Sequence, residues 1–275
     1  MTKEVKINNF KISNSLPLTL IAGPCQLENK EHAIFVAEHI KKICNKLKIN
    51  FIYKTSFDKA NRTSHLSKRG LGLDKSVEIF NEIKRLLKIP ILTDVHTSEQ
   101  CEKLKSIVDI IQIPAFLCRQ TDLLQSAART NLVINIKKGQ FLAPWDVPNI
   151  IRKVESINQN ILLTERGVSF GYNTLVSDMR SISIMKKENY PIIFDATHSV
   201  QQPGGKGDQS SGEREFIYDL SKAAVSIGIA GLFVEVHDNP DNAPSDGPNM
   251  LELSKLEDFL IKIIKIDNLI KSEKL

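Results

Sequence analysis

The stretch FIYKTSFDKANRTS, residues 51–64, decides how the rest of the chain is interpreted. Its apolar run, 51–53, breaks abruptly into three cations, Lys54, Lys59 and Arg62, which are separated by small polar residues. Lysine supplies a point charge and arginine a planar fork for phosphate or carboxylate, and neighbouring hydroxyls complete the oxygen shell. The pattern indicates an anion site at the end of a buried strand; a solvated basic loop is the alternative.

Eight short apolar runs, including this one, recur along the chain. They are rich in β-branched or aromatic residues and do not alternate strictly, as expected of parallel strands buried on both faces. The runs are 18–22, 51–53, 91–95, 109–113, 132–136, 161–163, 192–194 and 232–236. Segments with helical spacing separate them, so we predict an α/β protein with a (β/α)8 TIM barrel. A doubly wound open sheet is the competitor, but no Gly-rich dinucleotide fingerprint follows the first run.

The chain of 275 residues fits one domain of this kind, and no linker or shift in composition divides it. We therefore expect a single barrel domain over 1–275. Residues 3–14 alternate apolar and polar side chains around Asn8 and Asn9, which predicts an N-terminal β-hairpin that closes the bottom of the barrel.

Composition narrows the partners. The net charge of +5 is modest and the lysines are scattered, so nucleic-acid binding is not expected and small anionic substrates are favoured. The four cysteines show no tight pairing pattern and no signal peptide precedes them, which predicts a reducing, cytoplasmic location. No apolar run approaches the roughly 20 residues needed to span a bilayer, so no membrane association is expected.

In a barrel, the catalytic face lies at the carboxyl ends of the strands, and all eight predicted strands end in polar groups. One set of these side chains is cationic. Like charges repel one another, so bringing them together implies a substrate with several phosphate or carboxylate groups. The members of this set are Lys54, Lys59, Arg62, Arg119, Lys137 and Arg166. We expect one or two of them to form ordinary ion pairs instead, with Asp58, Asp122 or Glu165.

A second group is typical of a metal site: Cys25, His198, Glu235 and Asp246. One thiolate, one imidazole and two carboxylates suit a borderline divalent ion. Their spacing forms no local motif, and Cys25 as a small buried core thiol is the alternative. His96 and His237 fit supporting or core positions equally well. The connection 202–212 after the seventh strand is either a lid over the site or a plain loop.

Longer strings resemble one family along almost the whole chain. They are AGPC (22–25), KTSFDKANR (54–62), TDVH (93–96), QIPAFLCRQTD (112–122), KKGQFLAPW (137–145), ERGVSFGY (165–172), FDATH (194–198) and SDGP (245–248). These strings are similar to those of 3-deoxy-D-manno-octulosonate 8-phosphate synthases. That family consists of homotetrameric barrel enzymes that condense phosphoenolpyruvate with arabinose 5-phosphate and water, releasing phosphate, for lipopolysaccharide (Kdo) biosynthesis. The resemblance implies the same reaction here.

The resemblance also implies roles for individual residues. Catalytic roles fall to Lys59, Asn61, Asp94 and His198. Phosphoenolpyruvate would be held by Lys59, Gln112, Lys137 and Arg166, with Lys54 beside them. The phosphate of arabinose 5-phosphate would be held by Asn61, Arg62 and Thr63, and by Arg119 reaching in from a neighbouring subunit.

Cys25 also assigns the chain to a class within that family. Metal-dependent members carry cysteine after the first strand, and metal-independent members carry asparagine. The resemblance therefore favours Cys25, His198, Glu235 and Asp246 as ligands of a divalent metal, with Fe²⁺, Zn²⁺ and Mn²⁺ as the candidates.

Two other functions compete with this one. The sister family, 3-deoxy-D-arabino-heptulosonate 7-phosphate synthases, uses erythrose 4-phosphate and shares the Gly-Pro-Cys string and the metal set. Its loop after the second strand usually carries Lys-Pro-Arg, whereas this chain has Lys-Ala-Asn-Arg at 59–62, so Asn61 favours the octulosonate family. A non-catalytic phosphosugar-binding barrel is the second alternative; it is disfavoured because every matched site position is retained.

Overall fold

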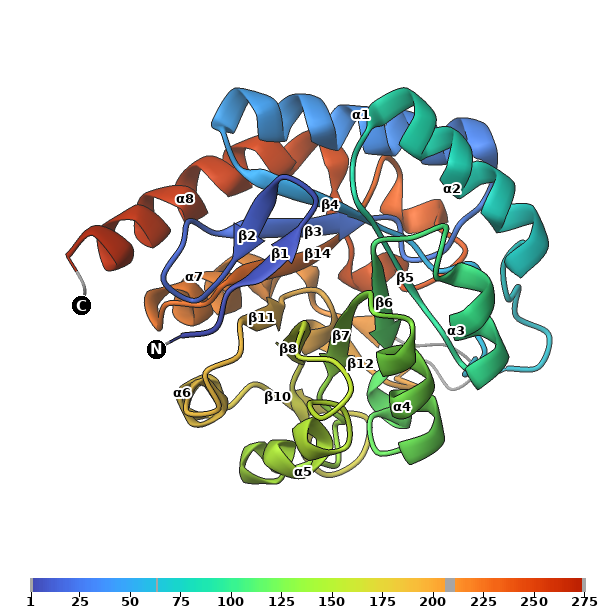
Figure 1. The fold of residues 1–275 in the computed structure, drawn as a ribbon. Helices are drawn as coiled ribbons and strands as arrows, with labels where there is room; N and C mark the ends of the chain where they lie inside the picture. The colour runs from blue at the N-terminus through green and yellow to red at the C-terminus, as the bar shows by residue number, and fades with distance from the viewer. Residues whose placement is uncertain (1, 63, 206–210, 274–275) are drawn as a thin grey trace.

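The computed structural model describes residues 2–62, 64–205 and 211–273, and its centre is a closed barrel of eight parallel strands (Figure 1). The hydrogen-bonded order follows the chain from β3 to β14, and β14 returns to pair with β3. The strands are β3 (Thr19–Gly23), β4 (Asn50–Lys54), β5 (Ile91–Asp94), β6 (Ile110–Ile113), β7 (Val133–Lys137), β8 (Ile161–Glu165), β11 (Ile192–Asp195) and β14 (Gly231–His237). The prediction of a (β/α)8 barrel is confirmed, and each strand overlaps a predicted apolar run.

Burial on both faces explains why these strands are continuous apolar runs. Side chains of successive residues point to opposite faces of a strand. Ile21, Ile52, Leu92 and Phe233 belong to the core inside the barrel, whereas Leu20, Phe51 and Ile91 belong to the layer between the barrel and its helices. Neither set is exposed to solvent, so no polar alternation survives in the sequence.

The N-terminal hairpin closes the amino-terminal end of the barrel. It consists of β1 (Val5–Ile7) and β2 (Phe10–Ile12), paired antiparallel with Val5 opposite Ile12. Asn8 in the turn has a φ of 49°, in the left-handed region that asparagine tolerates better than most residues. Val5, Ile7 and Ile12 are buried in the same core as the inward-facing barrel residues, which confirms the predicted bottom closure.

One α-helix follows each barrel strand, and the helices form an outer layer around the barrel (Figure 1). Helix α1 begins after Asn29, whose side chain accepts a hydrogen bond from the His32 backbone N–H, and it ends at a left-handed Lys48. The helices are α1 (Lys30–Leu47), α2 (Leu73–Leu87), α3 (Ser98–Leu104), α4 (Thr121–Arg129), α5 (Val147–Arg152), α6 (Arg180–Lys186), α7 (Ile217–Ser226) and α8 (Leu256–Ser272). Each buries an apolar face against the strands.

Short elements decorate the loops that follow the strands. The additional strands are β9 (Val168–Ser169), β10 (Leu175–Val176), β12 (Gln201–Gln202), β13 (Ser211–Gly212) and β15 (Leu251–Glu252). The 3-10 helices are η1 (Ala115–Leu117), η2 (Pro144–Asp146), η3 (His198–Val200), η4 (Arg214–Phe216), η5 (Pro240–Asn242), η6 (Gly247–Asn249) and η7 (Leu253–Lys255). The connection 202–212 begins and ends in the antiparallel pair β12–β13, and its residues 206–210 lie outside the described part of the chain.

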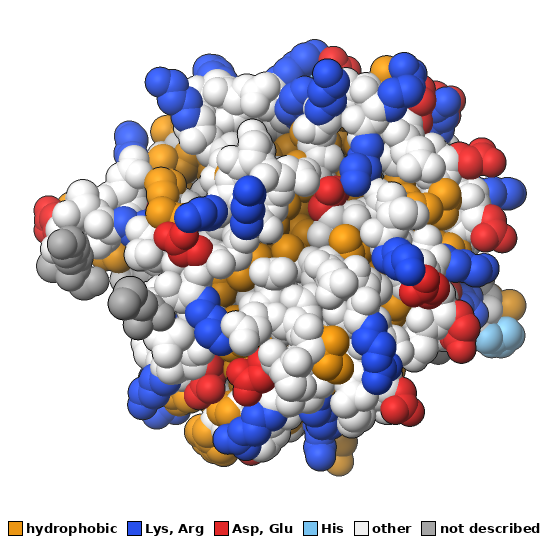
Figure 2. All heavy atoms as spheres, in the orientation of Figure 1, with side chains coloured by type: hydrophobic (Ala, Val, Ile, Leu, Met, Phe, Trp, Pro, Cys, Tyr) orange, Lys and Arg blue, Asp and Glu red, His pale blue; other side chains and the backbone are white. Residues whose placement is uncertain are grey.

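The surface seen from the hairpin side carries Lys and Arg side chains around its periphery, with Asp and Glu side chains among them (Figure 2). Within the described ranges, none of the helices has the length and apolar character required to cross a membrane.

Candidate active site

A cavity of about 580 Å³ opens at the carboxyl ends of the barrel strands. Most of the predicted site residues line it, although they come from widely separated parts of the chain. They are Lys54, Lys59, Asn61, Arg62, Asp94, Gln112, Lys137, Arg166, His198 and Asp246. Cys25 and Glu235 are fully buried beside Asp246, and Thr63 lies outside the described residues.

The predicted metal ligands form one cluster. Ligand atoms of Cys25, Glu235 and Asp246 all lie within 4.8 Å of one another. The Cys25 thiol donates to Asp246 Oδ2 over 3.1 Å, and His198 Nε2 lies 3.7 Å from Glu235 Oε2. Burial raises the pKa of the Cys25 thiol, and the Glu235 carboxylate raises it further. A bound cation would reverse this balance, because it stabilises the thiolate.

The cluster passes a chemical test for a divalent ion. Glu235 Oε2 is buried without a hydrogen-bond partner, although carboxylate oxygens in a protein interior are normally paired. Its second oxygen, Oε1, accepts from Lys54 Nζ over 2.5 Å. This unpaired oxygen lies beside a thiol, an imidazole and a second carboxylate. Together these groups form a donor set that suits a borderline divalent ion.

Asp195 holds two of the site residues in place from beneath. Its Oδ2 accepts from Lys137 Nζ and lies 2.7 Å from His198 Nδ1, while Oδ1 accepts the His198 backbone N–H over 2.9 Å. Burial alone would raise the pKa of Asp195, but His198 and Lys137 hold it well below its usual range. The Nδ1 contact aims Nε2 of His198 at Glu235, which is the orientation a ligating histidine requires.

Asp94 forms the centre of a second hydrogen-bonded group at the end of β5. Its Oδ1 accepts from the Ser56 hydroxyl and its Oδ2 lies 3.2 Å from His96 Nε2. Lys59 Nζ donates to Ser56 Oγ over 2.9 Å. Burial by itself raises the pKa of Asp94, but the hydrogen bond from His96 and the charge of Lys59 keep it depressed. His96, expected at either a supporting or a core position, therefore supports the Asp94 carboxylate at the cavity wall.

Gln112 is oriented by a chain of amides and hydroxyls inside the barrel. Asn135 Nδ2 donates to Gln112 Oε1 over 2.9 Å, and Thr164 Oγ1 donates to Asn135 Oδ1 over 2.6 Å. With its oxygen occupied in this way, Gln112 presents its NH₂ group as a hydrogen-bond donor.

Gln201 links the two predicted groups of residues. Its Oε1 accepts from Arg166 Nη2 over 3.0 Å, and its Nε2 donates to Asp246 Oδ1 over 2.9 Å. The same Arg166 nitrogen also donates to the backbone oxygen of His198 over 2.8 Å. The guanidinium of Arg166 is therefore fixed beside the metal-type cluster without being neutralised by a carboxylate.

The ion pairs differ from those expected. Two of the six cations are paired, as predicted in number, but Lys54 pairs with Glu235 and Lys137 with Asp195. The three acids predicted as partners do not pair with these cations. Asp58 forms an ion pair with Arg69, and Glu165 lies 3.5 Å from Lys138. Asp122 forms no ion pair within the described ranges. The proposed pairings were wrong because the order and register of the strands, which place β3 between β4 and β14, are not visible in the local sequence.

Three cations that line the cavity remain without an acid. Among the residues that the structure describes, Lys59, Arg62 and Arg166 have no carboxylate within 4.0 Å. Arg62 instead donates to the backbone oxygens of Lys68 and Pro244. Cations that line a cavity without a direct carboxylate partner are free to bind a ligand that carries several negative charges.

Arg119 lies apart from this cavity. It lines a separate hollow of about 270 Å³ together with Asp146, Asn149 and Lys153. Its expected contribution from a neighbouring subunit stays a prediction.

Three further residues of the site, Asp195, Gln201 and Ser56, received no role from the sequence, although Asp195 stands among the polar groups that end the predicted strands. Asp195 directly follows an apolar run and precedes His198 by three residues, so the carboxyl-end rule was a usable signal for it. Gln201 and Ser56 carry no such signal, because amides and hydroxyls at loop positions are common on any surface.

The chain folds as a (β/α)8 barrel whose carboxyl-end cavity contains several cations and adjoins a metal-type cluster. Comparison with known sequences identifies the family. The sequence model of the DAHP synthetase I family matches residues 3–272.

Individual relatives narrow the family further. The chain is 58% identical to a Brucella canis protein over 269 residues, which cover 98% of this chain and 97% of that one. It is 58% identical to a Rickettsia canadensis protein over 274 residues, which cover 99% of this chain and 100% of that one. Both relatives are named 2-dehydro-3-deoxyphosphooctonate aldolase, another name for the synthases that the sequence strings resemble. The chain belongs to the DAHP synthetase I family, in the group of the 2-dehydro-3-deoxyphosphooctonate aldolases. The predicted family is thereby confirmed.

Proposed function

We propose that the protein condenses phosphoenolpyruvate with D-arabinose 5-phosphate and water, giving 3-deoxy-D-manno-octulosonate 8-phosphate and inorganic phosphate. The observation that carries this proposal is the cavity in which Lys59, Arg62 and Arg166 lack acidic partners beside the metal-type cluster. Phosphoenolpyruvate and a pentose phosphate together bring two phosphates and one carboxylate, which these cations would neutralise. The product would enter lipopolysaccharide (Kdo) biosynthesis.

The substrates divide between two groups of side chains. Lys59, Lys137, Arg166 and the donor face of Gln112 would hold the phosphate and carboxylate of phosphoenolpyruvate. Asn61 and Arg62 would hold the phosphate of arabinose 5-phosphate, with Thr63 beside them and Arg119 supplied by a neighbouring subunit of a homotetramer. For Arg62 to bind phosphate, its guanidinium has to exchange its bonds to backbone oxygens for bonds to the ligand.

The chemistry needs positioning and charge stabilisation more than a strong base. C3 of phosphoenolpyruvate attacks the aldehyde carbon, water adds at C2, and phosphate leaves by cleavage of its bond to C2. Arg166 and Lys137 would offset the charge of the departing phosphate, and Asp94 would orient the hydroxyls of the sugar. Lys59, which hydrogen-bonds Ser56 next to Asp94 and lines the cavity, would lie where both substrates meet.

Cys25, His198, Glu235 and Asp246 would hold a divalent metal ion such as Fe²⁺, Zn²⁺ or Mn²⁺. When bound, the ion would act as a Lewis acid that organises the site and polarises an oxygen ligand. The chain's own part is to present the four donors, with Asp195 fixing the tautomer of His198 and Lys54 holding one oxygen of Glu235.

We also infer that the chain acts as one barrel domain over 1–275 and works in the cytoplasm. One core joins the strands to their helices, and all four cysteines, which are described, are free and buried.

The heptulosonate alternative is less favoured, because the relatives carry the octulosonate name and Asn61 lines the cavity.

Consumption of phosphoenolpyruvate tests the proposal. The purified, metal-loaded protein is offered arabinose 5-phosphate and erythrose 4-phosphate separately. We expect turnover with the five-carbon sugar; turnover only with the four-carbon sugar would assign the sister reaction, and no turnover with either would favour a binding protein.

Chelation is expected to abolish turnover, and Cys25→Asn to weaken metal binding. Cys44→Ser, at a buried cysteine in α1, serves as the matched control. Full activity of a verified metal-free preparation would refute the metal assignment.

A further inference from the structure

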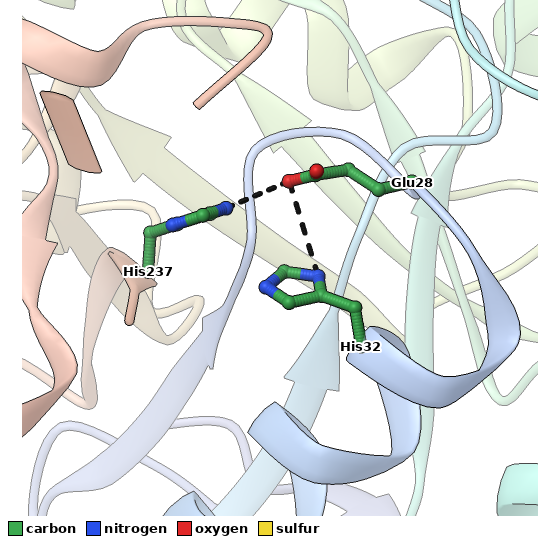
Figure 3. Close-up of side chains that lie close together, drawn as sticks. All are labelled: Glu28, His32 and His237. Carbon is green, nitrogen blue, oxygen red and sulfur yellow. Dashed lines mark hydrogen bonds and ion pairs between the residues drawn. The ribbon is translucent and has the colours of Figure 1, made fainter. Parts of the chain in front are cut away.

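A second cluster of metal-type side chains lies outside the lining of the catalytic cavity, where the first and last barrel strands meet. Glu28 belongs to the segment between β3 and α1, His32 to the first turn of α1, and His237 is the last residue of β14. Figure 3 shows the Glu28 carboxylate directed at both imidazole rings. We propose that Glu28, His32 and His237 form a second divalent metal site, for Zn²⁺ or an ion of similar preference, that joins these two segments.

The distances suit a tetrahedral ion after a small adjustment. The three ligand atoms lie within 4.8 Å of one another. Glu28 Oε1 is 2.7 Å from His237 Nε2 and 3.9 Å from His32 Nδ1. Tetrahedral zinc with bonds of about 2.0–2.1 Å separates its ligand atoms by about 3.3–3.4 Å, between these two values. A shift of the Glu28 carboxylate away from His237 and toward His32 therefore produces the required spacing.

An orphaned ring nitrogen supports the assignment independently. His32 Nε2 contacts Asp238 Oδ1 over 2.8 Å, which places a proton on Nε2. His32 Nδ1 is buried without a hydrogen-bond partner and faces the Glu28 carboxylate. In neutral imidazole this nitrogen carries a lone pair, so two electron-rich atoms face each other unless a cation lies between them. A histidine whose far nitrogen is held by a carboxylate is the usual supporting arrangement of metal-bound histidine.

Asp238 also provides for the second histidine. The Asn239 backbone N–H donates to His237 Nδ1 over 2.9 Å, so the ring proton sits on Nε2 and bonds Glu28. Metal binding at Nε2 moves that proton to Nδ1, where Asp238 Oδ1 lies 3.2 Å away to accept it. The Asn239 amide then gives up its bond to the ring. Two carboxylates and two neutral imidazoles carry a charge that one divalent ion balances.

The consequence is structural. Glu28 follows Cys25 by three residues and His237 follows Glu235 by two, so an ion shared by Glu28 and His237 would tie together the segments that carry two catalytic-site donors. This inference does not depend on the proposed reaction, since it is tested as binding.

Metal binding by the full chain decides the matter. In Cys25→Ala/His198→Ala, which removes two donors of the catalytic cluster, equilibrium dialysis against Zn²⁺ is expected to show one ion per chain. Co²⁺ in that protein should give visible bands without a thiolate charge-transfer band. Adding His32→Asn should weaken binding more than about 100-fold, and Asp238→Asn about 10–100-fold. His39→Asn, at an exposed histidine on the same helix, is the matched control and should change nothing.

The alternative is a protonated His32 that bridges the two carboxylates without any metal. No zinc binding by the folded double variant, or equal affinities in His32→Asn and His39→Asn, would establish that alternative and overturn the proposal. If the double variant fails to fold by circular dichroism, the parent protein answers the question. There, His32→Asn should lower the zinc content from two ions to one while the cobalt–thiolate band of the catalytic cluster persists, and an unchanged content would overturn the proposal.

Discussion

Replacing Asp195 with asparagine should destabilise the protein strongly although it changes little in shape. The Asp195 side chain is fully buried and its Lys137 partner is only 6% exposed. The amide of asparagine carries one oxygen and one NH₂ group. In the parent protein, Lys137 Nζ and the His198 backbone N–H each donate to one carboxylate oxygen. In either orientation of the asparagine amide, its NH₂ group would face one of these two donors, and that donor would lose its acceptor.

The expected magnitude follows from leaving a buried ammonium without its counter-ion. Removing one partner of a buried pair costs about 3–5 kcal/mol, whereas replacing both by apolar groups is often close to neutral. Asp195→Asn should therefore lower the free energy of unfolding by about 3–5 kcal/mol. Adding Lys137→Met removes the stranded charge and should recover at least about 1 kcal/mol of that loss.

Urea unfolding of metal-free protein, followed by circular dichroism, measures both values without a contribution from metal binding. Glu38→Gln is the matched control, because it makes the same carboxylate-to-amide change in an exposed pair with Lys42 at 3.4 Å. It should cost no more than about 0.5 kcal/mol. An Asp195→Asn variant within about 1 kcal/mol of the parent, or a double variant as unstable as the single one, would show that no buried charge is stranded.

Three further outcomes are expected. Ile12→Ala removes a fully buried side chain from the hairpin core and should lower the free energy of unfolding by about 2–5 kcal/mol in the same urea assay. Gly23→Ala places a Cβ atom 2.0 Å from the backbone oxygen of Lys54, which cannot move without opening the barrel. The yield of soluble folded protein should therefore fall sharply. A normal yield and melting temperature would contradict the clash. The depressed pKa of Asp94, which results from its bond to His96 and nearby charge outweighing burial, predicts stability that is full above about pH 4 and is lost as pH falls below it. Asp94→Asn should make the curve of unfolding free energy against pH flatter below about pH 4. An unchanged slope would argue against a depressed pKa of Asp94.

The architecture was predictable from the sequence because burial leaves a local signature. Strands covered on both faces must be apolar throughout, and helices covered on one face must repeat with their own period. These patterns located all eight barrel strands and the hairpin around Asn8. The carboxyl-end rule for barrels then placed the polar residues that follow the strands on one face, where most of them line one cavity.

The partners within the site were decided only by the tertiary structure. The sheet order β7–β8–β11 brings Lys137 to Asp195 across 58 residues of chain. Closure of the barrel brings β14 beside β3, so Lys54 meets Glu235 across 181 residues. The same closure brings Glu28 to His237, which no spacing in the sequence indicates. The physical reason is that burial constrains residue types one position at a time, whereas ion pairs and ligand sets depend on strand register and side-chain direction, which arise only when the sheet closes.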